Sequence, residues 1–364
     1  MTRDTPGTHT GEIWILGATG RIGRAVAARL AARGADIVLI GRSHESLRQV
    51  AAAAGRPGAN LVATDSVEHM AAEIASRRPG LVVNALGGYA ETAVGIARAC
   101  MPGGHYVDLA ADLVAIPRLL GLHRQAADVG STLITGAGFG VLATEAVVVK
   151  LCEGRPTPDQ VRADALASVA TEAGTMGTAF AATVVDAITS GGRRIENGQM
   201  VKTRLGSNVE THALPDGQTA KSAGAPSGEL LAVQRASNAP NVAVTSGLAP
   251  TSMLVRAALP LFAALLSMPP VRRVAVRQMA KAPIKAAPRP RTHSWGHVVA
   301  TWPDGSQTEG WLRTDDGMDY TADVITETAL RLADGHAPYG AYTPAAAFGP
   351  DLAIAAGGAF LLDR

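Results

Sequence analysis

The order of apolar and polar segments predicts an α/β protein whose first part is a doubly wound parallel sheet. An apolar run at residues 13–16 enters a glycine-rich turn, and a helical pattern follows the turn at once. Strand and helix patterns then alternate up to residue 135. This alternation is typical of βαβ units, in which each helix returns the chain to the next parallel strand.

Length and composition set the first limits. The 364 residues suffice for about two domains, and a net charge of +2 gives no overall basicity for nucleic-acid binding. Cys100 and Cys152 provide neither a disulfide framework nor metal-ligand spacing, so we predict a reducing, cytoplasmic setting and no metal site. The polar residues 1–11 lack the apolar core of a signal peptide and are expected to form a frayed tail.

The glycine-rich turn predicts a dinucleotide-binding, Rossmann-type sheet. Its spacing is G-x-x-G-x-x-G: Gly17 permits the tight turn, Gly20 lets a pyrophosphate approach the backbone, and Gly23 lets the helix pack closely. The N-terminus of the following helix offers unpaired N–H groups to phosphate. The residues predicted to contact the cofactor here are Gly17, Thr19, Gly20, Arg21, Ile22 and Gly23.

The second strand, within residues 36–43, indicates which cofactor binds. It ends in Gly41, Arg42 and Ser43, with no acidic residue for a ribose 2′-hydroxyl. A guanidinium and a hydroxyl can instead hold a 2′-phosphate, so we predict NADP(H) rather than NAD. In the alternative interpretation, Arg42 is a surface residue and Ser43 is the N-cap of the next helix.

The remaining elements of this part follow in order. Ile22, Val26 and Leu30 lie four residues apart and share one helix face. The further predictions are a helix at 43–54, a strand ending near residue 63, a helix from 66, a strand at 81–86, a helix to 100, a strand at 106–109, a helix to about 129 and a strand at 132–135.

Ligands of parallel sheets bind at the carboxyl ends of the strands. Asp65 follows the third strand and is a candidate partner of the adenine amine; its alternative role is an N-cap, since Asp65 and Glu68 have capping-box spacing. The fourth strand ends in residues predicted to line the ribose and nicotinamide, namely Asn84, Ala85, Leu86 and Gly87.

Two catalytic motifs are missing. None of the five tyrosines is followed four residues later by lysine, so the Tyr-Lys acid of short-chain dehydrogenases is not expected. The G-x-S-x-G nucleophile elbow is also missing from the sequence.

Several ordered segments resemble the saccharopine dehydrogenase-like reductases. The matching segments are Val82-Val83-Asn84-Ala85-Leu86-Gly87-Gly88-Tyr89, Ala99-Cys100-Met101-Pro102-Gly103-Gly104-His105-Tyr106-Val107-Asp108-Leu109, Ala137-Gly138-Phe139-Gly140, Tyr320-Thr321-Ala322 and Tyr342-Thr343-Pro344-Ala345. Two positions depart from the family pattern: Gly88 replaces a proline, and Gly140 stands where an aspartate is common. The resemblance implies that both positions line the substrate side of the site.

The resemblance implies a domain organisation and a reaction. It implies an NADP-binding domain at 1–135, an α+β substrate and dimerisation domain at 136–320, and C-terminal helices at 321–364 that return to the first domain. It also implies hydride transfer to or from a C=N or C=C bond of a small-molecule substrate, in a homodimer.

The candidate catalytic residues lie around the fifth strand. His105 or Tyr106 is a candidate proton donor, and Asp108 is a candidate for orienting that donor or holding a substrate cation. Cys100 completes the cluster. In the alternative interpretation, Tyr106 and Cys100 only pack in the core and His105 caps the strand.

The middle of the chain predicts several further elements. We expect a strand at 163–170, a helix at 172–188, a turn at 191–198, a hairpin with strands 298–302 and 308–312, and a helix at 321–333. Thr343 and Pro344 are expected to be the N-cap and first residue of a last helix.

Residues 230–303 contain no acidic residue but nine lysines and arginines, most of them at 272–291. An apolar stretch at 257–268, too short to cross a bilayer and interrupted by Pro260, precedes the basic run. One interpretation is a helix pair that covers the substrate site or a dimer interface, followed by a solvated linker. A second interpretation is contact of this segment with a membrane surface. A third is that some of the arginines bind a carboxylate or phosphate of the substrate. Nucleic acid is disfavoured because aromatic residues are not interleaved.

Three functional hypotheses follow. The first is an NADPH-dependent oxidoreductase of the family named above, acting on a small metabolite. The second is a non-enzymatic NADP-binding redox sensor that regulates a partner. The third is a peripheral membrane lipid enoyl reductase.

Overall fold

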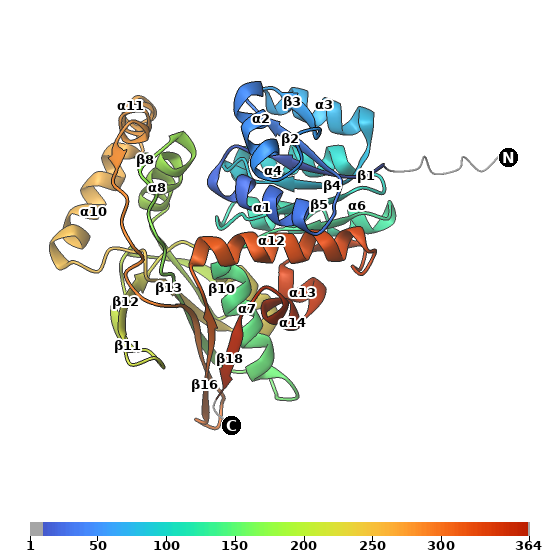
Figure 1. Ribbon diagram of the computed structural model, residues 1–364. Helices are drawn as coiled ribbons and strands as arrows, with labels where there is room; N and C mark the ends of the chain where they lie inside the picture. Colours follow the sequence, from blue (N-terminus) through green and yellow to red (C-terminus); the bar gives the residue numbers. More distant parts are fainter. Residues whose placement is uncertain (1–9, 363–364) are drawn as a thin grey trace. The chain divides into compact units, whose positions relative to one another are not determined.

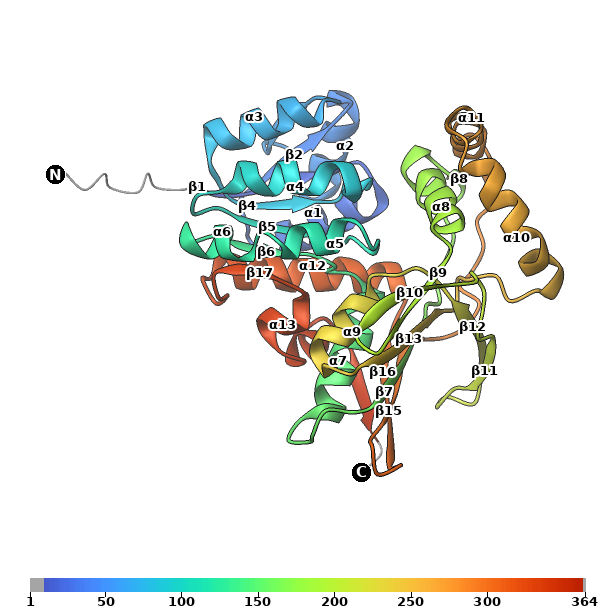
Figure 2. The same ribbon diagram turned by 180° about the vertical axis from the view of Figure 1, so that it is seen from behind.

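The computed structural model describes residues 10–362, which divide into two compact units (Figures 1 and 2). Among these residues, the first unit takes 10–109, 117–135 and 325–342, and the second takes 110–116, 136–324 and 343–362. Most of the expected N-terminal tail, residues 1–9, lies outside the described residues. Thr10 and Gly11, also expected in the tail, instead begin the first strand.

The first unit is a seven-stranded parallel sheet with the order β17-β6-β5-β4-β1-β2-β3. Figures 1 and 2 show α1 and α4 on opposite faces of this sheet. This arrangement confirms the predicted doubly wound class. The strands are β1 Thr10–Leu16, β2 Ile37–Gly41, β3 Asn60–Ala63, β4 Pro79–Asn84, β5 His105–Asp108, β6 Thr132–Ile134 and β17 Gly340–Tyr342. The helices are α1 Arg21–Ala32, α2 His44–Ala53, α3 Val67–Arg77, α4 Tyr89–Cys100, α5 Ala115–Leu120 and α6 His123–Asp128.

The helices form where the apolar spacing predicts them. Ile22, Val26 and Leu30 are all buried on α1, as expected for residues on one face. The single helix expected up to about residue 129 is wrong, because α5 and α6 are separate. Their break coincides with Gly121, whose N–H donates to the carbonyl of Pro117 and closes the last turn of α5.

The second unit is built on a nine-stranded mixed sheet. Its main path runs β10-β9-β13-β7-β15-β16-β18, with β12 joined to β13 and β11 to β12. Its strands are β7 Gln160–Leu166, β9 Gly192–Glu196, β10 Gln199–Thr203, β11 Glu210–Ala213, β12 Thr219–Gly224, β13 Asn241–Ser246, β15 Ser294–Thr301, β16 Gln307–Thr314 and β18 Ala359–Leu362, and the separate pair is β8 Gly174–Thr175 with β14 Pro283–Ile284. Its helices are α7 Phe139–Cys152, α8 Thr178–Ser190, α9 Glu229–Ser237, α10 Met253–Leu266, α11 Pro269–Ala280, α13 Pro344–Phe348 and α14 Asp351–Ala355.

Two expectations for the second unit are corrected. The helix expected at 172–188 begins only at Thr178, because residues 174–175 pair with β14. The turn expected at 191–198 is mostly the strand β9. Only Asn197 and Gly198, both at positive φ, turn the chain into β10. Two glycines at the ends of this segment suggested a turn, but pairing with β10 and β13 imposes the strand.

The predicted hairpin is confirmed as β15 and β16, and it fixes the position of α7. Gly296 on β15 lies against α7: a Cβ there would be 2.7 Å from the Cβ of Ala143 and 2.9 Å from its carbonyl carbon. Helix α7 is buried nearly all round, which fits its uniformly apolar sequence. The missing side chain of Gly296 therefore allows α7 to approach β15 closely.

The C-terminal segment departs from the expected return to the first domain. Helix α12, Gly317–Ala333, carries the chain from the second unit into the first, where β17 adds to β6. Residues 343–362 then group with the second unit, since β18 pairs with β16 and α13 and α14 pack on α7. Backbone pairing of β18 with β16 thus makes the last residues part of the second unit.

Thr343 is the N-cap of α13 and Pro344 its first residue, as predicted, but the Thr343 side chain does not cap the helix. Its hydroxyl donates to the buried carboxylate of Glu145 on α7. The same carboxylate accepts the N–H of Ala345 at 3.0 Å. Burial raises the pKa of Glu145 to about 7, although these hydrogen bonds oppose the rise.

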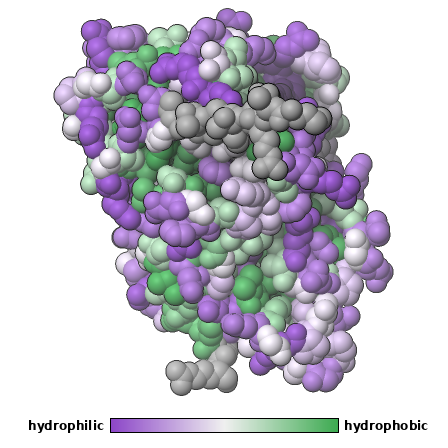
Figure 3. Space-filling model, turned by 90° about the vertical axis from the view of Figure 1, so that its right-hand side faces the viewer, coloured by the Kyte–Doolittle hydropathy of each residue, from purple (hydrophilic) through white to green (hydrophobic). Residues whose placement is uncertain are grey.

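Apolar side chains are distributed unevenly over the surface. On the face drawn in Figure 3, hydrophilic residues predominate and apolar residues gather in smaller areas between them. Helix α10 differs, because Leu259 is its one buried residue although the helix is strongly apolar. No single helix among the described residues is long and apolar enough to cross a membrane; α10 and α11 reach that length only together, across a bend of 116°.

The contact between Gly296 and α7 predicts opposite effects for two glycine substitutions. Gly296→Ala should lower the free energy of unfolding by about 1–3 kcal/mol, because its methyl group would meet the backbone of α7. Gly95→Ala is the matched control. Gly95 lies in α4 with open space around it, so alanine should stabilise that helix by up to about 1 kcal/mol. Urea unfolding followed by circular dichroism measures both. Equal effects would contradict the tight packing.

The raised pKa of Glu145 predicts a pH effect. Because the folded-state pKa is above the ordinary glutamate value of 4.5, the stabilising contribution is complete below about pH 4.5 and is lost as the pH rises towards 7. The loss is on the order of 3 kcal/mol. Glu145→Gln cannot ionise, so its stability should fall less than that of the parent chain between about pH 5 and pH 8. Exposed Glu45→Gln is the control, and an unchanged slope in Glu145→Gln would refute the prediction.

Candidate functional site

The turn between β1 and α1 depends on glycine for steric reasons. Gly17 has φ +74°, and a Cβ there would lie 2.6 Å from the carbonyl oxygen of Ala85 in the loop after β4. A Cβ at Gly23 would collide with the carbonyl oxygen of Gly17. The backbones of the turn, of α1 and of the β4 loop therefore touch directly.

The N-terminus of α1 lacks a side-chain cap. Gly20 is the N-cap and has no side chain to offer, and no acidic residue lies in the first turn. The preceding loop is fixed to the sheet, since Ala18 N–H donates to the Ile40 carbonyl of β2 at 3.1 Å. Arg24 donates to the Thr19 carbonyl at 2.8 Å. The helix end is thus held in place with N–H groups that suit a phosphate.

Arg42 and Ser43 have different surroundings. Ser43 is the N-cap of α2, and its hydroxyl accepts the N–H of Ser46 at 3.2 Å. Arg42 is exposed, and its guanidinium has no recorded partner among the described residues. Thr19 of the glycine turn lies beside Gly41, the residue before Arg42. The turn and the free guanidinium are therefore neighbours at the end of β2.

The capping role considered for Asp65 is wrong. Ser66 is the N-cap of α3, accepts the N–H of His69 and donates to the carboxylate of Glu68. Asp65 is exposed after β3 and makes no recorded side-chain hydrogen bond within the described residues. A role of Asp65 at the adenine stays a prediction.

Polar side chains at the carboxyl ends of β4, β5 and β6 form one buried chain of hydrogen bonds. Asn84 donates to the hydroxyl oxygen of Tyr106 at 3.0 Å, and Tyr106 donates to Asp108 Oδ2 at 2.9 Å. Thr135 donates to Asp108 Oδ1 at 2.9 Å. Asn84 also accepts the Leu86 N–H, which shapes the loop that meets Gly17. All four chain members are fully buried.

Sequence reasoning did not include Thr135 in this chain. The sequence did offer a signal for Thr135. This residue directly follows β6, and the carboxyl end of β6 lies beside the strand ends that carry Asn84 and Asp108. Asn84 and Asp108 are register partners on adjacent strands, so parallel pairing brings them together.

The four candidate catalytic residues predicted from the sequence do not lie together in the structure. His105 lies at the amino end of β5, the end opposite Asp108, and its Nδ1 accepts the N–H of Thr132 at 3.0 Å. Cys100 ends α4, and its thiol donates to the Ile96 carbonyl at 3.2 Å. Burial raises the pKa of that thiol. Burial and the neighbouring Asp108 charge raise the pKa of Tyr106 well above its usual range. Of the four candidate catalytic residues, Asp108 and the hydroxyl of Tyr106 lie at the carboxyl ends of the strands, where parallel sheets bind their ligands.

Another feature that sequence reasoning missed explains Gly140. The carboxylate of Glu229, from α9, occupies the space that a Cβ at position 140 would need, in the first turn of α7. Ser227 donates to this carboxylate, and burial raises the pKa of Glu229 to about 7. The second unit thus places a carboxyl group, carried by another helix, beside position 140.

Two motif segments that are distant in the sequence also meet in this unit: Phe139 N–H donates to the Thr321 hydroxyl at 3.0 Å.

The second unit contains a buried ionic cluster that sequence reasoning also missed. Asp164, His212 and His297 are buried, with ligand-type atoms within 4.8 Å of one another. The Arg162 guanidinium donates to Asp164 Oδ1 at 3.0 and 3.1 Å, and Thr245 donates to the same atom at 2.5 Å. The sequence signal for this cluster was the presence of polar residues at inward-facing positions of otherwise apolar strands.

The donors of this cluster are already used within the protein. His297 meets Asp164 through Nδ1 at 2.8 Å and Glu309 through Nε2 at 3.0 Å. Burial would raise the pKa of Asp164, but the His297 hydrogen bond and the Arg162 charge outweigh it and hold that pKa at about 2. A metal ion would have to bind beside the guanidinium and displace these bonds. We therefore interpret the cluster as an ion-pair network that joins β7, β15 and β16.

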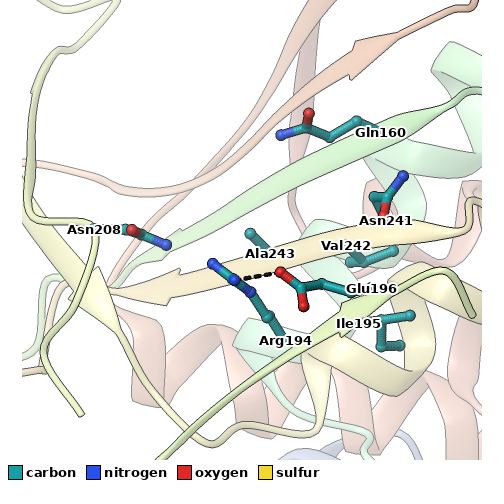
Figure 4. Close-up of a pocket in the computed structure, with 8 residues that line it drawn as sticks. All are labelled: Gln160, Arg194, Ile195, Glu196, Asn208, Asn241, Val242 and Ala243. Carbon is teal, nitrogen blue, oxygen red and sulfur yellow. Dashed lines mark ion pairs between the residues drawn. The ribbon is translucent and has the colours of Figure 1, made fainter. Parts of the chain in front are cut away.

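A small polar pocket lies on the strands of the second unit (Figure 4). Its lining comes from β7, β9 and β13 together with Asn208, and Arg194 and Glu196 form an ion pair within it. None of the predicted site residues lines this pocket.

The glycine turn, the uncapped helix end and the free Arg42 fit a nucleotide with an additional phosphate. A scan against family models agrees: residues 13–134 match the saccharopine dehydrogenase NADP binding domain. This match confirms the predicted cofactor, NADP(H). A search of curated proteins finds no match.

Solved structures with a similar fold include the apo histidine-tagged saccharopine dehydrogenase (L-Glu forming) of Saccharomyces cerevisiae. It shares 12% identity at a TM-score of 0.60, over 97% of this chain and 100% of that one. Serine dehydrogenase of Escherichia coli has a TM-score of 0.30 at 16% identity, over 34% of this chain and 80% of its own.

The family match covers the first domain, and the structural likeness covers the fold of nearly the whole chain. Residues 13–134 accordingly form a saccharopine dehydrogenase-type NADP-binding domain, and over the rest of the chain the likeness is one of fold.

Proposed function

We propose that this chain is an NADPH-dependent oxidoreductase that transfers hydride to or from a C=N or C=C bond of a small metabolite. The observation that carries the proposal is the uncapped end of α1, preceded by a turn in which glycine is sterically required, inside a matched NADP-binding domain. When bound, NADPH would supply the hydride for reduction, and NADP+ would accept it in the reverse direction. The likeness in fold to saccharopine dehydrogenase supports the same class of reaction.

In this proposal each part of the first unit has one task. The backbone N–H groups at the start of α1 hold the pyrophosphate, and the exposed guanidinium of Arg42 holds the 2′-phosphate. The loop from Ala85 to Gly87 lies at the carboxyl end of β4, where backbone without bulky side chains suits a flat ring.

Asp108 is the proposed positioning residue. Each of its carboxylate oxygens accepts a hydroxyl hydrogen bond, from Tyr106 and from Thr135. These bonds fix the carboxyl ends of β5 and β6 and the Asn84 amide that shapes the β4 loop. Cys100 has no role in this proposal, because its thiol is buried and bonded to its own helix.

A second candidate is a non-enzymatic NADP-binding redox sensor. The observation that favours it is the complete burial of Asn84, Tyr106 and Asp108, whose polar atoms bond to one another. A sensor needs NADP binding without turnover. Both candidates therefore share the cofactor site and differ in reactivity.

Arg42→Ala should weaken NADPH binding about 10- to 150-fold, the equivalent of about 1.5–3 kcal/mol for charge-assisted hydrogen bonds. NADH binding should change little, because that nucleotide lacks the 2′-phosphate. Arg48→Ala is the matched control, since Arg48 is an exposed arginine that pairs with Glu45 on α2. Isothermal titration calorimetry measures the dissociation constants. A similar loss for both nucleotides would exclude Arg42 as the 2′-phosphate ligand.

Turnover separates the two candidate functions. NADPH oxidation is followed by nicotinamide absorbance with a panel of imines and conjugated enones. The enzyme proposal expects turnover with at least one member, and Asp108→Asn should lower kcat by about 100-fold or more while the NADPH dissociation constant changes little. Asp108→Asn should also shift the pH profile of kcat. Cys100→Ala is the control and should keep kcat. Tight NADPH binding with no turnover on any compound would favour the sensor.

A further inference from the structure

Helices α10 and α11 leave an unusual amount of apolar surface in water. Among the described residues, nine of the seventeen exposed large apolar side chains fall within residues 248–274. Helix α10 buries only Leu259, and α11 buries no residue fully. An isolated exposed leucine needs no explanation, but a concentrated apolar surface of this kind marks an interaction site.

The exposed apolar residues of α10 form a stripe. Leu254, Leu261 and Leu265 are 83, 65 and 42% exposed, and their spacing of seven and four residues places them on one face. Phe262 and Val255 extend the stripe along its side. We call these five residues the apolar stripe.

The helix pair stands apart within its unit. Figures 1 and 2 show α8, α10 and α11 together, away from the large sheet of the second unit. The main contacts of α10 and α11 are with α8 and with each other. The described part of this unit therefore leaves the stripe uncovered.

Four cations accompany the apolar stripe. Arg273, Arg277 and Lys281 follow one another at intervals of four residues, and Lys285 comes next; all four are exposed and have no recorded carboxylate partner. Arg272, by contrast, pairs with Asp186 of α8, and Arg289 pairs with Asp315. We call the four unpaired residues the basic set. Like charges at this spacing repel one another unless an anionic partner is present.

We propose that α10 and α11 dock on a membrane surface that contains anionic lipid, with the apolar stripe in the acyl region and the basic set at the headgroups. Charge complementarity selects this occupant. A second copy of the chain, related by two-fold symmetry, would bring the same positive charges together. An anionic bilayer offers apolar depth and negative charge at once. The bend of 116° and the length of each helix suit a position within the interface rather than across it.

The first experiment measures partitioning of the full chain onto vesicles of phosphatidylcholine with and without phosphatidylglycerol, by sedimentation. Association should occur with the anionic vesicles at low salt and should fall as salt rises. Absence of association with anionic vesicles at low salt would overturn the proposal, and so would equal association with both compositions at all salt concentrations.

Two variants test the two components separately. Replacing Arg273, Arg277, Lys281 and Lys285 with glutamine should lower partitioning on the order of several hundred-fold, since each cation contributes about fivefold. The matched control replaces four exposed basic residues elsewhere, Arg124, Lys202, Lys221 and Arg313, and has the same net charge. Equal losses in both variants would show that net charge, and not this surface, drives binding.

The second variant replaces Leu254, Leu261 and Leu265 with serine and should lower partitioning on the order of 100-fold or more. Ile354→Ser is its control, because Ile354 is an exposed apolar residue on α14. Circular dichroism and NADPH binding check that each variant folds. If the triple variant converts a dimer to a monomer in sedimentation velocity while vesicle binding is unchanged, the stripe is a self-association surface and the proposal fails.

Leu261→Trp locates the stripe in the bilayer. Its added fluorescence should shift to the blue on binding and be quenched by lipids brominated in the acyl chain, whereas Ile354→Trp should be quenched little. Equal quenching at both positions would contradict docking through α10. These outcomes do not depend on the proposed reaction, because vesicle binding needs neither NADPH nor turnover.

Discussion

The contact between the glycine turn and the loop after β4 is the constraint on which the rest of the nucleotide domain depends. Gly17 meets the Ala85 carbonyl with no space for a Cβ, and α1 meets the turn equally closely at Gly23. The end of β1, the start of α1 and the loop after β4 therefore meet through direct backbone contacts. The N-cap of α1 is Gly20, which has no capping side chain, so the N–H groups at this end of the helix suit a phosphate.

The buried chain from Asn84 to Thr135 continues that constraint across the sheet. Its bonds connect the ends of β4, β5 and β6, and the Asn84 side chain also accepts the Leu86 N–H next to the Gly17 contact. Four buried polar groups are costly unless they are paired, and here each has a partner. The residues that seemed most reactive in the sequence are thus the ones most firmly held. This restraint is why Asp108 acts by positioning in the proposed function, and why a sensor is the competing function.

The second unit combines ordinary packing with two unusual features. A carboxyl group from α9 fills the space beside Gly140, and an ion-pair network lies within the sheet around Asp164. In contrast, α10 and α11 bury almost nothing. Apolar helices gain little from folding unless another surface covers them, which motivates the docking surface proposed above.

The sequence by itself determined the features that rest on local spacing. The glycine turn, the apolar face of α1, the hairpin of β15 and β16 and the order of elements in the first unit all depend on contacts between residues near one another in the chain. The family resemblance rested on the same kind of local signal. Tertiary structure alone decided the rest. His105 was separated from Asp108 because strand direction puts them at opposite edges of the sheet, and Glu229 reached Gly140 from another helix. The last residues joined the second unit because β18 pairs with β16. Such pairings depend on which distant strand or helix arrives alongside, and no local periodicity encodes that choice.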